Sequence, residues 1–487
     1  VLLTGPFAYK FKKPLELPFL DFSTLAQRHR CCVEEVRLNR RTAADLYVGV
    51  VRLVATPDGP VIDGDGPVLD YAVKMVQFPE SARADVALAR GALGAGEIQA
   101  FAGLIGDFHE DAGVAKPGAP HGCAACVRDE AISNLRELRQ SQAARALRGR
   151  RDRQLAELER WTIQTTQTLS EAFARRRATG HVRECHGDLH LANLVLLNAT
   201  LLPFDCIEFN ERLRWIDTMS DLAFVLMDLE AHERPDLGRL LLDCYLARTG
   251  DYDGLQVLRH YEVYRALVRA KVAAIETVTS AGNGEARHRM HAQLDLAERI
   301  VNAPRNPRLL LLHGASGTGK SWLVRKLIPH GTFVSVRSDV ERRRLFAPAR
   351  SPSEIASRPM PYTDEATAQT YERLSECARS IVQAGHAALV DATFLDRRQR
   401  ERFRLLAREL GVPVRIVDVV AARAIMEARV ADRARNRADA SEADVEVLRE
   451  QLATLTPLAP EEEHFTTVVD TTREVDAAAL AATLLGA

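Results

Sequence analysis

The stretch GASGTGKS at residues 314–321 constrains the fold of this chain more than any other feature. It directly follows an apolar run at 309–312, and a helical pattern begins directly after it. Every position fits G-x-x-x-x-G-K-[ST], in the strand–loop–helix context where this pattern forms a phosphate-binding loop. The glycines let backbone N–H groups converge on an anion at a helix N-terminus, where the helix dipole adds positive charge. A chance glycine-rich turn is the alternative.

This loop predicts a nucleotide site that uses ATP and Mg²⁺. The Lys320 ammonium is expected to reach the β- and γ-phosphates, and the Ser321 hydroxyl is expected to bind Mg²⁺. The loop residues expected to contact the nucleotide are Gly314, Ser316, Gly317, Thr318, Gly319, Lys320 and Ser321.

Strand and helix patterns alternate after residue 307. The apolar stretches LLLLH, FVSVRSD, AALVDA and VRIVDVV are each followed by a helical pattern, which predicts a parallel sheet covered on both faces. Two prolines within 302–307 stop the preceding helix. We therefore place a linker at 302–307 between a domain at 1–301 and a domain at 308–487. The chain has room for both, because a domain takes roughly 150 residues.

Two aspartates, Asp339 and Asp391, end predicted strands of the second domain. Ligands of an open parallel sheet lie beyond the carboxyl ends of its strands. One aspartate is therefore expected to act as base for an acceptor hydroxyl and the other to hold Mg²⁺ or its water, with helix capping as the alternative for each. Three arginines at every fourth residue share a helix face and predict a lid over the transferring phosphoryl group, with a solvated face as the alternative. They are Arg429, Arg433 and Arg437.

Residues 308–487 resemble small P-loop kinases, especially the polynucleotide-kinase, gluconate-kinase and zeta-toxin group. The resemblance rests on GASGTGKS, RSDVERRR, VDATF and RVADRARNR. It implies that Asp339 is the base and that a nearby arginine, Arg342, contacts the acceptor. Asp391 is then left for the metal.

The part before residue 302 begins with strand patterns and continues mainly as helices. A helix is expected from Ser23, which is a suitable cap, and helical spacing predominates from residue 80 to 178 and from 217 to 301. The predicted strands lie at 1–4, 7–12, 47–54, 69–76, 194–197 and 201–204. Because the first strands look like the middle of a hairpin, we expect that the sequence lacks its natural N-terminus.

The stretch HGDLHLAN at residues 186–193 reproduces the spacing of the kinase catalytic loop H-R-D-L-x-x-x-N, with glycine in place of arginine. Asp188 is expected to accept the proton of an acceptor hydroxyl, and Asn193 to bind Mg²⁺. Asp205 follows the next hairpin, where a second metal-binding aspartate is required. A coincidence of spacing is the alternative.

Residues 1–300 resemble the aminoglycoside phosphotransferase and choline-kinase-like branch of the kinase fold. The resemblance implies an α+β bilobal kinase-like domain, followed in this chain by the α/β P-loop domain with a parallel sheet. The arginine that is absent at position 187 is the one that pairs with a phosphorylated activation loop. Its absence favours a small acceptor.

The lysine that holds the α- and β-phosphates has three candidates. Tyr71-Ala-Val-Lys74 imitates V-A-I-K, but a kinase lobe places this lysine before the glutamate-bearing helix, and Glu35 precedes Lys74. Lys10 and Lys12 precede that helix and share one strand face; we prefer Lys12 as the partner of Glu35. An exposed cluster of lysines is the alternative.

The strand that ends at residue 76 is then expected to enter the hinge between the lobes, where Val76 and Gln77 meet adenine. The strands of a phosphate-covering loop are absent from the sequence.

The composition indicates a cytoplasmic protein with no membrane partner. A formal charge of −1 excludes a global attraction to nucleic acid, and no apolar run approaches the roughly 20 residues that span a bilayer. The eight cysteines are scattered, which favours reduced thiols. Cys123 and Cys126, preceded by His121, have metal-like spacing but lack a second pair.

We interpret the chain as an ATP-dependent phosphotransferase with two Mg-ATP sites that phosphorylates hydroxyl groups of a small molecule. A kinase of RNA or nucleotide ends is one alternative. A nucleotide-sensing regulatory protein, with one or both sites non-catalytic, is the other. The sequence does not define the acceptor, the choice between ATP and GTP, or the oligomeric state.

Overall fold

A computed structural model describes residues 1–17, 20–279, 283–346, 363–436 and 445–486. The chain divides into two compact units. The first consists of Val1–Leu241 and Val257–Ala303, and the second of Leu242–Gln256 and Pro304–Ala487. The break near residue 303 lies in the expected linker. Residues 242–256, which we had assigned to the first domain, belong instead to the second unit.

The first unit begins with a five-stranded antiparallel sheet in the order β1-β2-β7-β5-β6. Its strands are β1 (Leu2–Thr4), β2 (Phe7–Phe11), β5 (Tyr47–Thr56), β6 (Gly59–Ile62) and β7 (Val68–Val76). Four of them confirm sequence predictions, whereas β6 was not predicted. A two-stranded ladder, β3 (Glu16–Leu17) and β4 (Leu20–Asp21), follows β2.

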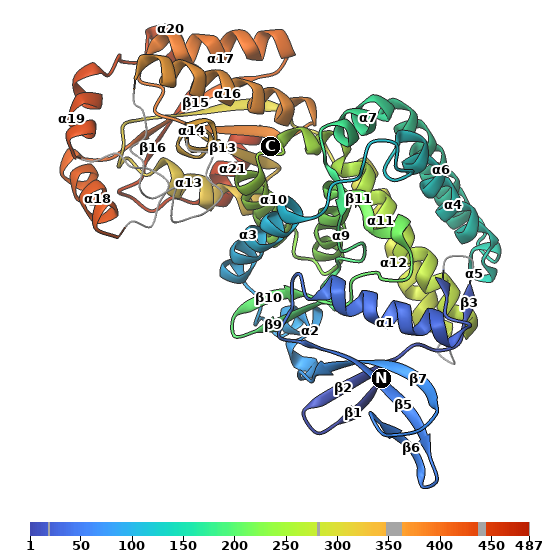
Figure 1. The fold of residues 1–487 in the computed structure, drawn as a ribbon. Helices are drawn as coiled ribbons and strands as arrows, with labels where there is room; N and C mark the ends of the chain where they lie inside the picture. Colours follow the sequence, from blue (N-terminus) through green and yellow to red (C-terminus); the bar gives the residue numbers. More distant parts are fainter. Residues whose placement is uncertain (18–19, 280–282, 347–362, 437–444, 487) are drawn as a thin grey trace. The chain divides into compact units, whose positions relative to one another are not determined.

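Helix α1 (Leu25–Asn39) packs on β7 and β5 of this sheet (Figure 1). Thr24, not Ser23, is its N-cap: the Thr24 hydroxyl accepts the N–H of Gln27 at 3.2 Å, and the Gln27 side chain accepts the Thr24 N–H at 3.2 Å. This reciprocal pair satisfies two backbone donors at once. Ser23 instead bonds Asp21, so our predicted cap was one residue too early.

The rest of the first unit is mainly helical and carries the catalytic-loop segment between short strands. Its core joins apolar side chains of α4, α6, α9, α11 and α12. The larger helices are α2 (Ala84–Ala89), α3 (Ala95–Asp111), α4 (Ala124–Gln140), α6 (Arg150–Thr168), α7 (Ser170–Ala178), α9 (Thr218–Ala231), α11 (Leu255–Thr279) and α12 (Asn283–Asn302). The short elements are α5 (Gln142–Arg145), α8 (Glu211–Arg214), β8 (Val182–Glu184), β9 (Leu194–Leu197), β10 (Thr200–Pro203) and β11 (Trp215–Asp217). Helix α10 (Pro235–Thr249) begins in this unit and ends in the second.

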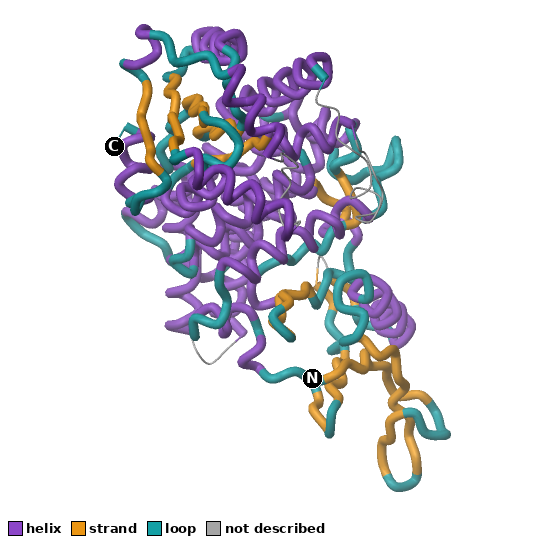
Figure 2. The backbone as a smooth tube through the Cα atoms, turned by 90° about the vertical axis from the view of Figure 1, so that its left-hand side faces the viewer, coloured by secondary structure: helices purple, strands orange, loops and turns teal. Residues whose placement is uncertain are grey.

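The second unit contains a five-stranded sheet in which every pair is parallel, in the order β13-β14-β12-β15-β16. In Figure 2 these strands are flanked by helices. The strands are β12 (Arg308–His313), β13 (Phe333–Arg337), β14 (Ala387–Asp391), β15 (Val414–Val420) and β16 (Thr466–Asp470). Four of them confirm the predicted alternation, and β16 was not predicted.

Helices pack on both faces of this sheet, as the continuous apolar strands predicted. On one face, Leu310, Leu312 and Leu389 pack with Leu323 and Leu484. On the other, α16 and α17 contact β12 and β14. The helices are α13 (Lys320–Leu327), α14 (Ser338–Phe346), α16 (Asp364–Gln383), α17 (Arg397–Leu410), α18 (Arg423–Asn436), α19 (Val445–Thr454), α20 (Pro460–Glu463) and α21 (Ala477–Leu485).

The segment 242–256 forms hydrogen bonds with β13, an edge strand of the parallel sheet. The Asp243 carboxylate accepts the Ser335 N–H at 2.6 Å and the Ser335 hydroxyl at 3.0 Å, and the Tyr252 hydroxyl donates to the Ser335 carbonyl at 3.3 Å. An edge strand leaves a row of backbone groups without ladder partners. Two of these backbone groups, the Ser335 N–H and the Ser335 carbonyl, are satisfied here by a segment that is distant in sequence.

We predict that Asp243 makes the stability of the second unit depend on pH. Burial raises the pKa of Asp243 to about 6. The folded state binds the Asp243 proton more tightly than the unfolded state does. Protonation of Asp243 therefore stabilises the folded state fully below about pH 4, and this stabilisation is lost as the pH rises through 6. Asp243→Asn keeps both hydrogen bonds to Ser335 but removes the carboxyl group that titrates. The stability difference between wild type and variant should therefore change by roughly 2–3 kcal/mol between pH 4 and 7, measured by denaturant unfolding. A constant difference would contradict the prediction.

Two cysteines correct the expectation of reduced thiols. Cys123 and Cys126 form a disulfide, so their sulfurs are bonded to each other instead of to a metal. The other six cysteines are free. Over the described ranges, the helices include none with the length and apolar character required to cross a bilayer.

Candidate functional sites

The predicted P-loop connects β12 to α13 in the second unit. Gly317 has φ +84°, and a Cβ there would lie 2.6 Å from the carbonyl oxygen of Met426. Both the backbone conformation and the close approach therefore require glycine. The loop reaches the N-terminus of α13 at Lys320, so its N–H groups lie where the helix dipole favours an anion.

The side chains expected to bind phosphate and metal converge beside this loop. The Lys320 ammonium donates to the carbonyl oxygens of Gly314 at 2.7 Å and Ala315 at 3.0 Å, so it folds back over the loop. The Ser321 hydroxyl donates to the Asp391 carboxylate at 2.7 Å. Asp391 is the last residue of β14 and is 5% exposed. A hydroxyl and a carboxylate in contact form a hard-oxygen donor set, which suits Mg²⁺.

A cavity of about 350 Å³ opens next to these groups. Asp339 lines it from the first turn of α14, two residues after β13 ends, so it follows the strand instead of ending it. Arg342 lies one turn further along α14 and donates to the Thr367 hydroxyl at 3.4 Å. The predicted base, metal ligand and phosphate ligand therefore share one cavity.

Three further side chains contact the loop from outside it: Arg429, Gln451 and Thr471, whose hydroxyl donates to the Thr318 carbonyl. Arg429 of α18 donates to the carbonyl oxygens of Gly317 at 3.2 Å and Thr318 at 3.3 Å, and to the Thr471 hydroxyl at 2.9 Å. The Gln451 side-chain oxygen accepts the Ser316 N–H at 2.8 Å. Sequence reasoning missed Gln451, because a glutamine on an amphipathic helix carries no signal. The Arg433 side chain and all of Arg437 lie outside the described parts of the chain.

The kinase-like loop of the first unit is held by a buried carboxylate from α9. Asp221 accepts the N–H of His186 at 2.9 Å and of Gly187 at 2.8 Å. Burial alone would raise the pKa of Asp221, but its hydrogen bond to His109 and the other polar contacts lower the pKa to about 2. Arg265 of α11 donates to the Gly187 carbonyl at 3.0 Å. The only sequence signal for these anchors is an acidic residue within the apolar run MSDLAFVL.

The glycine at position 187 has a local reason. Its φ is +86°, and a Cβ would lie 2.6 Å from the carbonyl oxygen of Leu213. No side chain fits this space. The packing of the loop therefore requires glycine at position 187, where protein kinases have arginine.

Asp188, Asn193 and Asp205 lie together after this turn. The Asn193 amide donates to the Asp188 carboxylate at 2.8 Å. Burial alone would raise the pKa of Asp188, but the hydrogen bond and charge of His190 lower it. Asp205, at φ +63°, donates its N–H to the Tyr47 hydroxyl at 3.0 Å. The N–H of Phe204, the residue before Asp205, donates to the Asn193 carbonyl at 3.0 Å, which places Asp205 beside the loop.

Two candidate lysines, Lys10 in β2 and Lys12 directly after it, both contact Glu35 of α1. Lys10 lies between Glu35, at 2.9 Å, and Asp205, with which it forms an ion pair. Burial would lower the pKa of Lys10, but Asp205 and Glu35 raise it well above its ordinary value. Lys12 is buried deeper and pairs with Glu35 and Glu208. The predicted pair of Lys12 with Glu35 is therefore present, and Lys10 is the lysine that also pairs with Asp205.

Lys74 and Gln77 are placed differently from the lysine–aspartate cluster. The Lys74 ammonium lies 4.1 Å from the centroid of the Phe7 ring. Its strand neighbour on β2 is Tyr9, so it faces away from Lys10. The Gln77 N–H donates to the Pro6 carbonyl at 2.9 Å, so the backbone of Gln77 is bonded to the turn between β1 and β2.

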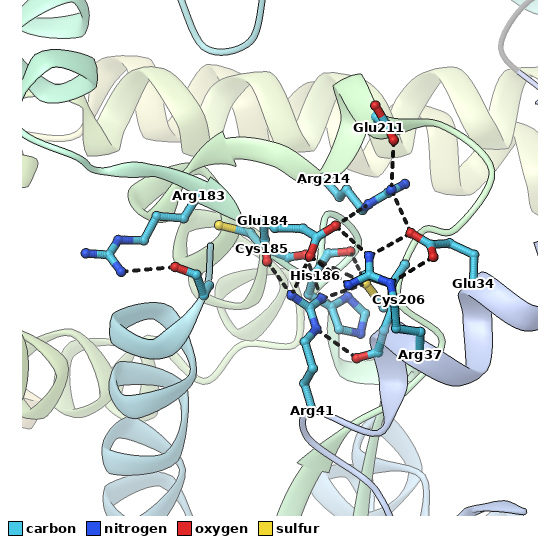
Figure 3. Close-up of polar contacts among 12 residues, drawn as sticks. Glu34, Arg37, Arg41, Arg183, Glu184, Cys185, His186, Cys206, Glu211 and Arg214 are labelled. Carbon is cyan, nitrogen blue, oxygen red and sulfur yellow. Dashed lines mark hydrogen bonds and ion pairs between the residues drawn. The ribbon is translucent and has the colours of Figure 1, made fainter. Parts of the chain in front are cut away.

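An ion-pair network fixes α1 against the segment that leads into the kinase-like loop (Figure 3). Arg37 of α1 bonds Glu184 of β8 at 2.7 Å and Glu34 at 2.6 Å, and Arg214 bonds Glu34 at 2.9 Å. Arg41 donates to the Glu184 carbonyl at 2.6 Å. Since Glu184 is two residues before His186, the network sets the distance between Glu35 and the loop. Its members come from separate segments, so the sequence offers no pattern for it.

The comparison with known families defines the class of the second unit. A family profile described as an AAA domain matches residues 309–458. Together with the parallel sheet and the loop geometry, this match identifies a P-loop nucleotide-binding domain.

The chain also has relatives that match most of its length. It is 30% identical over 451 residues to uncharacterized protein Rv2004c of Mycobacterium tuberculosis. The match covers 91% of this chain and 86% of that protein. Uncharacterized protein Mb2027c of Mycobacterium bovis matches to the same extent. The chain belongs to the same family as these mycobacterial proteins.

Solved structures similar to parts of the chain include three kinases. A sugar kinase from Janibacter has a TM-score of 0.28 and 22% identity, covering 37% of this chain and 94% of its own. A gluconokinase from Sinorhizobium meliloti has a TM-score of 0.28 and 20% identity, covering 37% and 93%. An ethanolamine kinase from Plasmodium vivax has a TM-score of 0.31 and 10% identity, covering 46% and 64%.

Proposed function

We propose that this protein is an ATP-dependent phosphotransferase with two nucleotide sites that phosphorylates hydroxyl groups of small molecules. The observation that carries the proposal is the contact between the Ser321 hydroxyl and the Asp391 carboxylate beside Lys320, in a cavity that also holds Asp339. Phosphoryl transfer depends mainly on positioning and on charge stabilisation. This cavity supplies a phosphate loop, a metal-ligand pair and a second carboxylate.

Each group in the second site has one part in the reaction. The loop amides and Lys320 bind the phosphates, and Arg429 closes over them from α18. Ser321 and Asp391 would hold Mg²⁺, which would supply positive charge to neutralise the phosphate oxygens. Asp339 orients the acceptor hydroxyl and accepts its proton as the oxygen attacks.

The first site has a matching set of groups. Asp188 takes the part of the base, and Asn193 and Asp205 would provide oxygen ligands for Mg²⁺. Lys10 takes the phosphate-binding part that we first assigned to Lys12, because Lys10 lies next to Asp205. Glu35 holds this ammonium in place, as the ion pair between the two shows.

The test is transfer of labelled γ-phosphate from ATP to sugars, sugar acids, aminoglycosides, nucleosides and RNA ends by the full-length chain. Label in a stable product would support the proposal. Nucleotide binding without transfer to any acceptor would instead favour a nucleotide-sensing protein. The observation that supports this second candidate is the bond from the Ser316 N–H to Gln451, which links the P-loop to α19.

We predict that Lys10→Met lowers transfer at the first site at least about tenfold, because a charge-assisted contact to phosphate is lost. Lys12→Met should act on stability instead, since it leaves two buried glutamates without their shared cation. Lys13→Met, at an exposed position, is the matched control. Rates are compared in a Lys320→Ala background, with thermal unfolding of each variant. A stable Lys12→Met protein without transfer, beside an active Lys10→Met protein, would reverse the assignment.

A further inference from the structure

The Cys123–Cys126 disulfide has no part in the proposed transfer reaction. It lies at the start of α4, where Cys123 is the N-cap residue and Cys126 lies in the first turn. Both side chains are only partly buried, so the thiol of another molecule can reach the sulfur atoms. Thiol–disulfide exchange requires such access together with a stable leaving thiolate.

The surroundings of the two sulfur atoms suit a reduced pair as well as a disulfide. The Cys126 N–H donates to Cys123 Sγ at 3.0 Å, and this sulfur lies at the N-terminus of α4, where the helix dipole favours a negative charge. Both interactions favour a thiolate at Cys123, which makes it the better leaving group. Cys126 Sγ lies 2.9 Å from the Pro120 carbonyl oxygen, which can accept a hydrogen bond from a Cys126 thiol.

The other cysteines are poorly suited to this chemistry. Five of the six free cysteines are buried, and Cys244 is half-buried. Burial raises the pKa of Cys32 and the pKa of Cys244 to about 12. At neutral pH these thiols stay protonated and are weak nucleophiles. We therefore expect exchange to concentrate at the Cys123–Cys126 pair.

The segment before the disulfide, residues 113–122, runs beside β8. The Ala115 N–H donates to the Val182 carbonyl at 2.9 Å, and the Glu184 N–H donates to the Gly113 carbonyl at 2.9 Å. The first residues of the segment therefore bond to β8 through the backbone.

The last residues of the segment contact β8 again, next to the disulfide. Gly122 directly precedes Cys123, and a Cβ at Gly122 would lie 2.5 Å from Val182 Cγ2. The His121 ring stacks on Trp215 of β11, with 5.9 Å between the ring centroids. Because β11 pairs with β8, the residues beside the disulfide contact both strands of this ladder.

A cavity of about 260 Å³ separates the middle of the segment from the ion-pair network. Its lining includes Lys116, Ala119 and His121 of the segment, and Glu184 and Arg214 of the network. A segment with a cavity beside it has fewer packing contacts to hold it in place. Its position therefore depends strongly on its two ends, one of which is joined to the disulfide.

Strand β8 connects this segment to the kinase-like loop. Glu184 ends β8, lies two residues before His186, and bonds Arg37 of α1 at 2.7 Å (Figure 3). The His186 N–H is held in turn by Asp221 at 2.9 Å. A change in the order of β8 therefore acts on the start of the loop that carries Asp188.

We propose that Cys123–Cys126 is a reversible exchange site for a dithiol reductant, and that its disulfide form keeps β8 and the kinase-like loop ordered for transfer. The part that concerns transfer rests on the proposed function of the first site. A thiolate of the reductant attacks Cys126 Sγ, the S–S bond breaks, and its electron pair leaves on Cys123 Sγ. The second thiolate of the reductant then displaces Cys126 from the mixed disulfide. Two electrons and two protons pass to the cysteines, and the reductant becomes a disulfide.

The first experiment measures exchange without turnover. The full-length chain is equilibrated with mixtures of reduced and oxidised dithiothreitol, quenched with acid and alkylated, and each cysteine is quantified by mass spectrometry. We expect Cys123 and Cys126 to titrate together in one reversible two-electron step, whereas Cys244 is alkylated equally in every mixture. A pair that stays reduced in every mixture, or that is reduced only when the chain unfolds, would overturn the exchange site.

The second experiment measures the order of β8 in each state. Amide hydrogen exchange of residues 182–193 is compared between the oxidised and the reduced wild-type chain. Reduction removes a constraint beside β8, so we expect these amides to exchange at least about threefold faster. Cys126→Ser should match the reduced chain in either reagent, and Cys244→Ser should respond as wild type. Equal exchange in the two wild-type states would overturn the link to the loop.

Transfer of labelled phosphate is then compared in both states of a Lys320→Ala chain, in which the second site does not contribute. We expect transfer to fall at least about threefold on reduction and to recover on reoxidation, in step with the order of β8. Equal transfer in both states would overturn the control of transfer. Redox-dependent order of β8 without transfer to any acceptor would instead support the exchange site and overturn the proposed function.

Discussion

Asp188→Asn is expected to reduce phosphoryl transfer at the first site at least about a hundredfold, because a base that orients and deprotonates an acceptor contributes 10²–10⁴ in rate. The substitution is made in a Lys320→Ala background so that the second site does not contribute. Nucleotide affinity and thermal stability should be retained, since Asn has nearly the same shape and Lys10, Asn193 and Asp205 remain. Transfer is measured with labelled ATP, and affinity by calorimetry.

The control for this variant is Asp129→Asn, which removes an exposed carboxylate on α4 of the same unit. It should transfer phosphate as the parent does. Unimpaired transfer by Asp188→Asn would show that the kinase-like loop is not catalytic and would favour the nucleotide-sensing interpretation.

Lys320→Ala is expected to remove one of two nucleotide sites. The ammonium is the cation held directly over the loop, by bonds to the Gly314 and Ala315 carbonyls. Without it, the phosphates meet only neutral amides and the more distant Arg429. Titration of ATP with Mg²⁺ should give two sites in wild type and one in the variant, whose remaining site keeps its affinity.

Lys326→Ala is the matched control, since Lys326 lies on the same helix and is exposed. It should retain two sites. Unchanged stoichiometry and affinity in Lys320→Ala would contradict the assignment of the P-loop as a nucleotide site.

The two sites differ in how far their sequence predicts their geometry. The P-loop is a contiguous segment whose glycines and helix start determine its shape locally, so the placement of Lys320 and Ser321 followed from eight residues. Asp391 could be assigned because carboxyl ends of parallel strands lie on one edge of a sheet. Gln451 and Thr471 could not, because they reach the loop from segments more than 100 residues away.

The lysine of the first site shows the limit of strand alternation. Alternation places Lys10 and Lys12 on the same face but does not say which lies nearer the loop at Asp188. The answer depends on where Asp205 and Glu208 lie after the β9–β10 hairpin, and these residues are almost 200 positions later in the chain. The predicted Lys12–Glu35 pair is present, but local pattern could not show that Lys10 also pairs with Asp205.

The sequence by itself determined the features that depend on near neighbours: the P-loop, the alternating strands and helices of the second unit, the hairpins, and the spacing of Asp188, Asn193 and Asp205. Only the tertiary structure decided that Asp221 and Arg265 hold the kinase-like loop, that residues 242–256 pack with the second unit, and that the residues beside the Cys123–Cys126 disulfide contact β8. The reason is physical. Helical and strand periodicity and turn chemistry act over a few residues, whereas burial and ion pairing depend on which distant segments the folded chain brings together.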